Sequence, residues 1–378
     1  MQTMQPVIVF GSYMLDEELI PVDEFELRVR SVQSVMAGNG WSGLIAYGDP
    51  LENAVLTYTT NYAPRNRPAI ALIPPDGDPR MLVSASPRDI KREASLAWMD
   101  DVRMIGNLGD SLGAWLDDAG IDIGTVALIG GANMRPPAFD ATTEACVSRG
   151  LKIANADAAM AALLHRKRPR EMVVVRRAAG ILTETAESLS AAWKSGATAS
   201  EAVLAAEKAA FTLQALDART LFSIDGGRTL RPYERPMQDR PKRLAAYVAV
   251  RYQAYWAEAF VTLSPRRSKI QIAAGDALAR MIAAAGPGVT GAELQIAAGP
   301  PGPYKTHPAI GASLGHGIGL SLSEMPDLSP GNSDAMIENG TYSLTVGLSE
   351  GRRNHALTSA MVALGPDGAE VLWRMPRP

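Results

Sequence analysis

The chain has 378 residues, of which 47% are hydrophobic and 20% charged, so it can bury a sizeable core and is long enough for two domains. A formal net charge of −3 gives no electrostatic reason to expect nucleic acid or an anionic membrane as a partner. The single cysteine, Cys146, excludes an intramolecular disulfide and a thiolate metal site, and its helix-like surroundings indicate a packing residue rather than a nucleophile.

The first part of the chain alternates between helical and strand-like patterns. Residues 23–38 are charged and amphipathic, which predicts a helix. Short apolar runs, most of them ended by glycine or proline turn signals, predict strands at residues 43–47, 67–73, 80–83 and 126–129. Because strands that alternate with helices indicate an α/β layer, we place a first α/β domain at residues 1–157.

From residue 158 onward, helices come first and strands follow. Apolar residues step by three or four between Glu171 and Gly196, which predicts one long helix. Three further helices are predicted, at the capping boxes Thr198-x-x-Glu201 and Thr290-x-x-Glu293 and at residues 271–285. Strands are predicted in residues 244–263, 341–346 and 360–364. This order indicates an α+β domain at residues 158–378.

No apolar run approaches the roughly 20 residues that span a bilayer. The run at residues 6–10 is short and has neither a basic region nor a cleavage-like site. We therefore expect a cytoplasmic protein.

Several motifs in the second domain occur in an order and spacing that resemble one family. They are Lys167-Arg-Pro-Arg-Glu171, Gly315-His-Gly-Ile-Gly319, Glu324-Met-Pro326 and Gly365-Pro-Asp-Gly-Ala-Glu-Val-Leu372. They resemble the K-x-P-x-E, GHGIG, HE-x-P and T-x-x-G-x-E-x-L motifs of the creatinase/prolidase/methionine-aminopeptidase family. This resemblance implies a C-terminal pita-bread fold, in which helices back an antiparallel sheet.

The first domain resembles the lead domain of the creatinase/prolidase branch. The matching segments are Tyr47-Gly48-Asp49, Tyr58-x-x-Asn61-Tyr62 and Pro75-x-Gly77-x-Pro79. The resemblance also implies a homodimer, in which the lead domain covers the partner's pocket. We place the loop at residues 58–67 at that interface.

Members of the family that bind two metals use Asp, Asp, His, Glu and Glu as ligands. The resemblance places these positions at Tyr247, Glu258, His316, Thr345 and Ser359. A hairpin centred between Tyr252 and Gln253 would set Tyr247 opposite Glu258. Divalent ions normally need three or more protein ligands, and only Glu258 and His316 bind such ions well, so we expect no metal and no other cofactor.

Creatinase resembles this fold and hydrolyses a C–N bond without metal, through a histidine base that follows a glycine-rich turn. Here the turn begins at Gly226, and Tyr233 takes the place of that base. The creatinase mechanism is therefore not retained intact. We expect a metal-independent, creatinase-like hydrolase that acts on a C–N or related bond of a small polar metabolite by acid/base catalysis.

The candidate catalytic residues are Glu258, His316, Tyr247 and Glu324. Desolvation among aromatic neighbours is expected to raise the pKa of Glu258, unless Glu258 instead forms an ion pair with Arg251. His316 either meets a ligand between its two glycines or is a relic hydrogen-bonded in the core. Tyr247 either donates a hydrogen bond to an oxyanion or fills the space of the metals.

The expected substrate-binding residues are Tyr233, Arg251, His307, Thr345, His355 and Ser359. His307 lies where the family places another active-site histidine. His355 either faces substrate together with its neighbouring arginines or belongs to a polar loop. The replacements at the former ligand positions are polar and titratable, which favours an enzyme. A metal-free lyase or isomerase remains an alternative, as does a non-catalytic pseudopeptidase that binds a ligand or partner.

Overall fold

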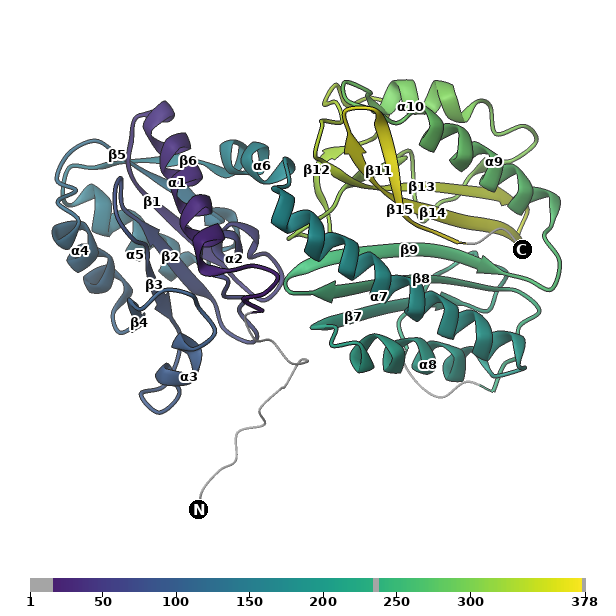
Figure 1. Cartoon of the computed structure of the whole chain (residues 1–378), viewed down its shortest axis with the longest axis horizontal. Coiled ribbons are helices and arrows are strands. Elements are labelled where there is room, and N and C mark those ends of the chain that lie inside the picture. The colour runs from purple at the N-terminus through teal and green to yellow at the C-terminus, as the bar shows by residue number, and fades with distance from the viewer. Residues whose placement is uncertain (1–15, 234–237, 376–378) are drawn as a thin grey trace, which may run out of the picture. The chain divides into compact units, whose positions relative to one another are not determined.

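The structure is a computed structural model that describes residues 16–233 and 238–375, so the apolar run at residues 6–10 lies outside the described residues. The chain divides into two compact units, one that ends at Leu164 and one that begins at His165 (Figure 1). Within the described ranges, no helix is long and apolar enough to cross a membrane.

The first unit is a six-stranded mixed sheet with helices around it. Its strands, in the order β4-β3-β2-β1-β5-β6, are β1 (Trp41–Gly48), β2 (Ala69–Ile73), β3 (Arg80–Val83), β4 (Val102–Met104), β5 (Thr125–Ile129) and β6 (Lys152–Asn155). Its helices are α1 (Val22–Asn39), α2 (Ala54–Thr60), α3 (Ile90–Ala94), α4 (Leu108–Asp118), α5 (Pro136–Val147) and α6 (Asp157–His165). Burial of Cys146 in this core raises its thiol pKa to about 11, which confirms a packing residue.

Helix α2 was not predicted because its buried residues include threonines, which interrupt any apolar period. The hydroxyls of Thr59 and Thr60 donate to carbonyl groups three or four residues earlier, so they are satisfied inside the helix. Residues 58–64 are buried within the unit, which leaves only residues 65–67 of the proposed interface loop at least partly exposed.

The second unit contains two antiparallel sheets backed by helices. One sheet has the order β7-β8-β9, with β7 (Asp217–Ser223), β8 (Leu244–Tyr252) and β9 (Tyr255–Leu263). The other has the order β12-β11-β13-β14-β15, with β11 (Gly315–Gly317), β12 (Glu324–Asp327), β13 (Thr341–Glu350), β14 (Asn354–Gly365) and β15 (Gly368–Arg374), and β10 (Lys305–Thr306) also pairs with β13.

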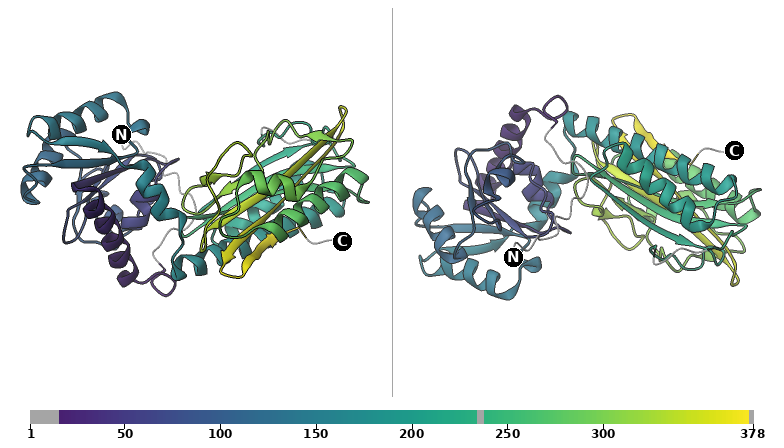
Figure 2. Two further views of the ribbon diagram at one scale, coloured as in Figure 1. Left: turned by 90° about the horizontal axis from the view of Figure 1, so that it is seen from above. Right: turned by 90° about the horizontal axis from the view of Figure 1, so that it is seen from below.

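Four helices accompany these strands (Figures 1 and 2). They are α7 (Pro169–Lys194), α8 (Ala199–Thr212), α9 (Lys269–Ala284) and α10 (Gly291–Ala298). The capping boxes of Thr198 with Glu201 and of Thr290 with Glu293 are both present, as the sequence predicts. Together these elements confirm an α+β unit of the pita-bread kind.

The alternation of side chains on β13 separates a core face from a site face. Tyr342, Leu344, Val346 and Leu348 belong to the core cluster that includes α9. Because successive side chains of a strand point to opposite faces, Ser343 and Thr345 lie on the other face. Strands β9 and β14 join the two sheets beside it, where Ser359 Oγ accepts a hydrogen bond of 2.8 Å from the Phe260 N–H.

The β8–β9 hairpin turns one residue later than expected. Tyr252 pairs with Tyr255, and Ala249 rather than Tyr247 lies opposite Glu258. The centre of the turn consists of Gln253 and Ala254, both with positive φ (43° and 70°). Tyr247 and Glu258 are therefore diagonal neighbours on one face, which still lets their side chains meet.

Candidate active site

The candidate active site is built around Glu258 on β9 and His316 on β11. Nε2 of His316 lies 3.1 Å from Oε1 of Glu258, and the Tyr247 hydroxyl donates a hydrogen bond of 2.7 Å to Oε2. Only 2% of the Glu258 side chain is exposed, against 25% of the His316 side chain. The histidine is therefore the member of this group that a ligand can reach, and it is not sealed in the core.

Both ring nitrogens of His316 face acceptors. Nδ1 lies 2.9 Å from the Gly317 carbonyl oxygen, and Nε2 faces the Glu258 carboxylate. Burial lowers the pKa of His316, but Glu258 outweighs burial and holds that pKa above its ordinary value. Burial raises the pKa of Glu258, yet His316, Ser343 and Tyr247 together bring it below its ordinary value. The arrangement favours an imidazolium–carboxylate pair.

The expected rise in the pKa of Glu258 is thus wrong, because His316 supplies a positive charge that the strand sequence does not reveal. The alternative ion pair with Arg251 is not formed either. Arg251 Nε donates to the Ala254 carbonyl at 3.0 Å, and its guanidinium lies 5.5 Å from the centre of the Trp256 ring.

Tyr247 serves as a hydrogen-bond donor to Glu258. Burial and the adjacent carboxylate raise the pKa of its phenol, so the hydroxyl stays protonated. The Phe260 ring lies 4.8 Å from the Tyr247 ring and fixes its position. Tyr247 therefore orients the carboxylate that pairs with His316.

The glycines on either side of His316 allow close backbone contacts. A Cβ atom at Gly315 would lie 2.0 Å from the Ser343 carbonyl oxygen, and one at Gly317 would lie 2.2 Å from the Met325 carbonyl oxygen. No side chain fits at either position. These contacts let the backbone on either side of His316 lie close to the neighbouring strands β12 and β13.

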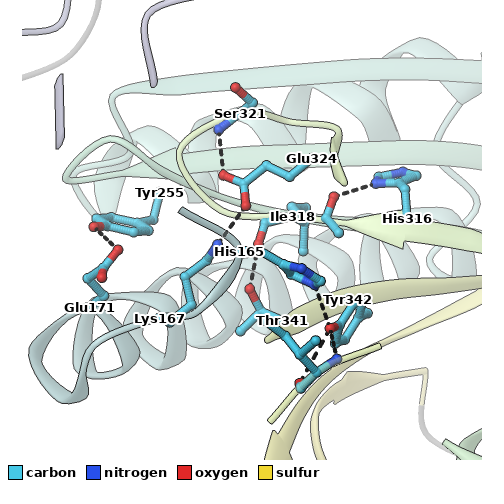
Figure 3. Close-up of polar contacts among 12 residues, drawn as sticks. His165, Lys167, Glu171, Tyr255, His316, Ile318, Ser321, Glu324, Thr341 and Tyr342 are labelled. Carbon is cyan, nitrogen blue, oxygen red and sulfur yellow. Dashed lines mark hydrogen bonds and ion pairs between the residues drawn. The ribbon is translucent and has the colours of Figure 1, made fainter. Parts of the chain in front are cut away.

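Glu324 supports the loop after β11 through a buried ion pair (Figure 3). Its Oε2 lies 2.6 Å from Nζ of Lys167, and its Oε1 accepts a hydrogen bond of 3.1 Å from the Ser321 N–H. A Cβ atom at Gly319 would lie 2.6 Å from Lys167 Cε, so only glycine leaves room for the pair. None of the contacts of Glu324 within the described chain reaches Glu258 or His316. Its catalytic role stays a prediction.

The last two former ligand positions lie opposite one another. Thr345 on β13 pairs with Ser359 on β14, and both side chains are buried. Ser359 Oγ already accepts the Phe260 N–H, which links the two sheets. A role for either hydroxyl in binding substrate stays a prediction.

The side chains at the five former ligand positions do not fit the two metal ions that the two-metal members of the family bind. Glu258 and His316 are engaged with each other, and Tyr247 is a protonated phenol that donates rather than a phenolate. Thr345 and Ser359 bring neutral hydroxyls in place of carboxylates. Across the described ranges, no group of three or more His, Cys, Asp or Glu side chains is placed to hold a metal ion.

His307 and His355 form a second buried group. His307 Nε2–H donates to the Gly227 carbonyl at 2.7 Å while its Nδ1 accepts from the Ala309 N–H, which fixes a neutral tautomer. The His355 ring packs edge-on against His307 at 5.2 Å between centres. His355 lies in β14 and is buried, so its expected alternative place in a polar loop is wrong. Neither histidine contacts His316 in the described structure.

Tyr233 is half-buried and makes no hydrogen bond or ion pair with any described residue. Arg251 is buried and packs against Trp256, as described above. For both residues, a contact with substrate stays a prediction.

Sequence reasoning missed Arg219, which lies on the same face as Glu258. Arg219 pairs with Ala249 in the ladder, and Ala249 in turn pairs with Glu258. Its guanidinium lies 4.5 Å from the centre of the Trp256 ring, and 39% of its side chain is exposed. Strand β7 is only half-buried along most of its length and shows no clear alternation, so no sequence pattern predicts it.

The fold and site together define a pita-bread protein with a smaller N-terminal α/β domain of the creatinase/prolidase type. The chain belongs to metallopeptidase family M24, which matches residues 173–363. This confirms the resemblance read from the motifs and supports a hydrolase as the class of protein. A comparison with curated proteins gave no match.

Solved structures with the same fold include two peptidases and one domain of a protein that is not named as a peptidase. An X-Pro aminopeptidase from Thermotoga maritima is 19% identical, with a TM-score of 0.75 over 92% of this chain and 98% of that one. An Xaa-Pro dipeptidase from Bacillus anthracis is 16% identical, with a TM-score of 0.74 over 94% and 99%. The N-terminal domain of the FACT complex subunit SPT16 from chickpea (Cicer arietinum) is 16% identical, with a TM-score of 0.67 over 93% and 96%.

Proposed function

We propose that this protein is a metal-independent hydrolase that cleaves a C–N or related bond of a small polar substrate. The observation that supports this most strongly is the buried Glu258–His316 pair at two former ligand positions, with Tyr247 at a third. Membership of a peptidase family supports hydrolysis as the reaction class.

In this proposal His316 transfers the proton, and Glu258 and Tyr247 position it. No hydrogen bond within the described chain occupies Oε1 of Glu258, although Nε2 of His316 lies 3.1 Å away. The Nε2–H faces the carboxylate without an aligned hydrogen bond, so in this proposal it can also donate to a substrate. In hydrolysis the imidazolium gives its proton to the leaving nitrogen as the C–N bond breaks, and the attacking water returns a proton to Nε2 while its oxygen bonds to the carbon.

Arg219 supports a substrate that carries a negative charge. It shares the face of Glu258, its guanidinium lies 4.5 Å from the centre of the Trp256 ring, and its side chain stays 39% exposed although its Nε pairs with Asp217 at 3.1 Å. A planar guanidinium is suited to bidentate binding of a carboxylate. One structural relative is named an Xaa-Pro dipeptidase, and Xaa-Pro dipeptides are small and polar and carry a carboxylate, so they are reasonable first substrates to test.

The test is an assay of amine release from a panel of small amides, amidines and Xaa-Pro dipeptides, with protein treated with a chelator and with protein incubated with Mn²⁺ or Zn²⁺. The proposal expects turnover by the chelated protein and its loss in His316→Asn. Turnover only after addition of metal would make the protein a metallopeptidase. An isomerised or eliminated product from the same panel would favour the lyase or isomerase alternative.

A non-catalytic role is the second candidate, because one structural relative is named as the N-terminal domain of a subunit of the FACT complex and not as a peptidase. Saturable binding of a panel compound with no turnover by chelated or metal-treated protein would favour this alternative.

We also propose a cytoplasmic homodimer that acts on a small molecule and binds neither nucleic acid nor membrane. The exposed residues Asn66 and Arg67, together with the half-buried Arg65, are the accessible part of the expected interface loop. A monomer in light scattering at micromolar concentration would contradict the dimer.

A further inference from the structure

A second concave site lies in the C-terminal unit and contains none of the five former ligand positions. It is a cavity of about 460 Å³ between α7 and α9, where the ends of β9, β14 and β15 come together. Its apolar walls include Ala186, Val261, Leu263, Ala274, Leu278 and Trp373. Cavities of roughly 300–1,000 Å³ with mostly apolar walls and a few polar groups are typical of small-molecule sites.

The charged residues of this cavity are mostly cationic. Lys194, Arg267 and Arg374 line it, against the single carboxylate of Glu187. These three residues are exposed, and within the described ranges their side chains form no ion pair or hydrogen bond. Positive charge beside an apolar wall is complementary to an amphipathic anion.

Two further residues shape the wall of this cavity. Ser190 on α7 is only 6% exposed, and it lines the cavity. Gly275 lies inside α9, where glycine is destabilising, and a Cβ atom there would lie 2.7 Å from Nη2 of Arg267. The missing side chain lets the guanidinium lie against the helix at the cavity wall.

We propose that this cavity binds a small organic anion with an apolar body, such as a medium-chain carboxylate. The carboxylate contacts Arg267 and its neighbouring cations, the apolar body lies against Leu263, Leu278 and Trp373, and the Ser190 hydroxyl donates a hydrogen bond to the carboxylate. This site is independent of the hydrolase proposal, because no former ligand position contributes to it.

The test is calorimetric titration of the full-length protein with decanoate and with decan-1-ol, its uncharged counterpart. Decanoate should bind at one site per chain and at least about tenfold more tightly than decan-1-ol, a ratio that corresponds to roughly 1.4 kcal/mol. Arg267→Ala should weaken decanoate binding about tenfold and leave decan-1-ol binding unchanged. The matched control is Arg266→Ala, since Arg266 is exposed and does not line the cavity.

Gly275→Leu, which places a side chain at the cavity wall, should abolish binding of both compounds while the circular dichroism spectrum stays unchanged. Should Gly275→Leu fail to fold, Ser190→Ala provides a second test, with an expected loss of about fivefold in decanoate affinity from one hydrogen bond. Equal affinity for both compounds, equal effects of the two arginine variants, or no binding at all would overturn the proposal. Loss of decanoate binding in His316→Asn would place the ligand in the active site instead.

Discussion

Glu324 and Glu258 are two carboxylates of the C-terminal unit that each pair with a cation. The two cations differ in how exposed they are and in whether they titrate near neutral pH. Glu324 pairs at 2.6 Å with Lys167, and both side chains are almost fully buried. Glu258 pairs at 3.1 Å with His316, which is titratable near neutral pH and a quarter exposed. A sealed pair with a fixed charge holds a loop in place, whereas a pair with one exposed, titratable member can transfer a proton. We therefore assign a structural role to the Glu324–Lys167 pair and a chemical role to the Glu258–His316 pair.

The largest effect that we expect from a change at either carboxylate is a loss of turnover at Glu258. Glu258→Gln removes the charge that holds His316 as an imidazolium, and general acid–base catalysis contributes about 10²–10⁴-fold. We expect turnover of an identified substrate to fall by about that factor while substrate binding persists, as measured by single-turnover kinetics and calorimetry. Near-full activity in Glu258→Gln would show that the site is assigned wrongly.

For the free energy of unfolding, we expect the large effect at Glu324 instead of at Glu258. Glu324→Ala removes the carboxylate beside the buried Lys167 ammonium, and breaking a buried pair costs about 3–5 kcal/mol. The matched control is Glu370→Ala, because Glu370 pairs with Arg176 while both are about half exposed, and such pairs contribute about 0–1 kcal/mol. Urea unfolding of the two variants measures the contrast. If Glu324→Ala and Glu370→Ala destabilise the protein equally, the Glu324–Lys167 pair does not stabilise the loop after β11.

The stability that the Glu258–His316 pair contributes should depend on pH. The lowered pKa of Glu258 stabilises the fold above its unfolded value of about 4.5, and this contribution is lost as the pH falls through the folded pKa. The raised pKa of His316 stabilises below its unfolded value of about 6.5, and this contribution is lost as the pH rises through the folded pKa. The contribution of the pair is therefore largest between about pH 4.5 and 6.5.

Wild type and His316→Asn should differ most in free energy of unfolding inside that window, and the difference should shrink on both sides. Urea unfolding at a series of pH values measures it. A difference that is constant with pH would mean that the pair is not ionic.

The sequence predicted the family, the fold and most long elements, because capping boxes, apolar periods and glycine motifs are local signals. Those signals do not fix register. The hairpin centre was misplaced because Gln253 and Ala254 take positive φ without a glycine to mark the turn. The direction of the Glu258 pKa was missed for a similar reason, since its partner His316 comes from a strand much later in the chain.

We propose that His316 is a stable imidazolium paired with Glu258, at positions where the resemblance places the metal ligands of the two-metal relatives. Nitrogen NMR of the His316 ring, titrated from pH 5 to 9 with and without added Zn²⁺ or Mn²⁺, tests it most directly. We expect two protonated ring nitrogens above pH 6.5 and no change at the ring when metal is added in stoichiometric amounts. A neutral ring below pH 6.5, or a ring signal shifted or broadened by one equivalent of metal, would contradict it.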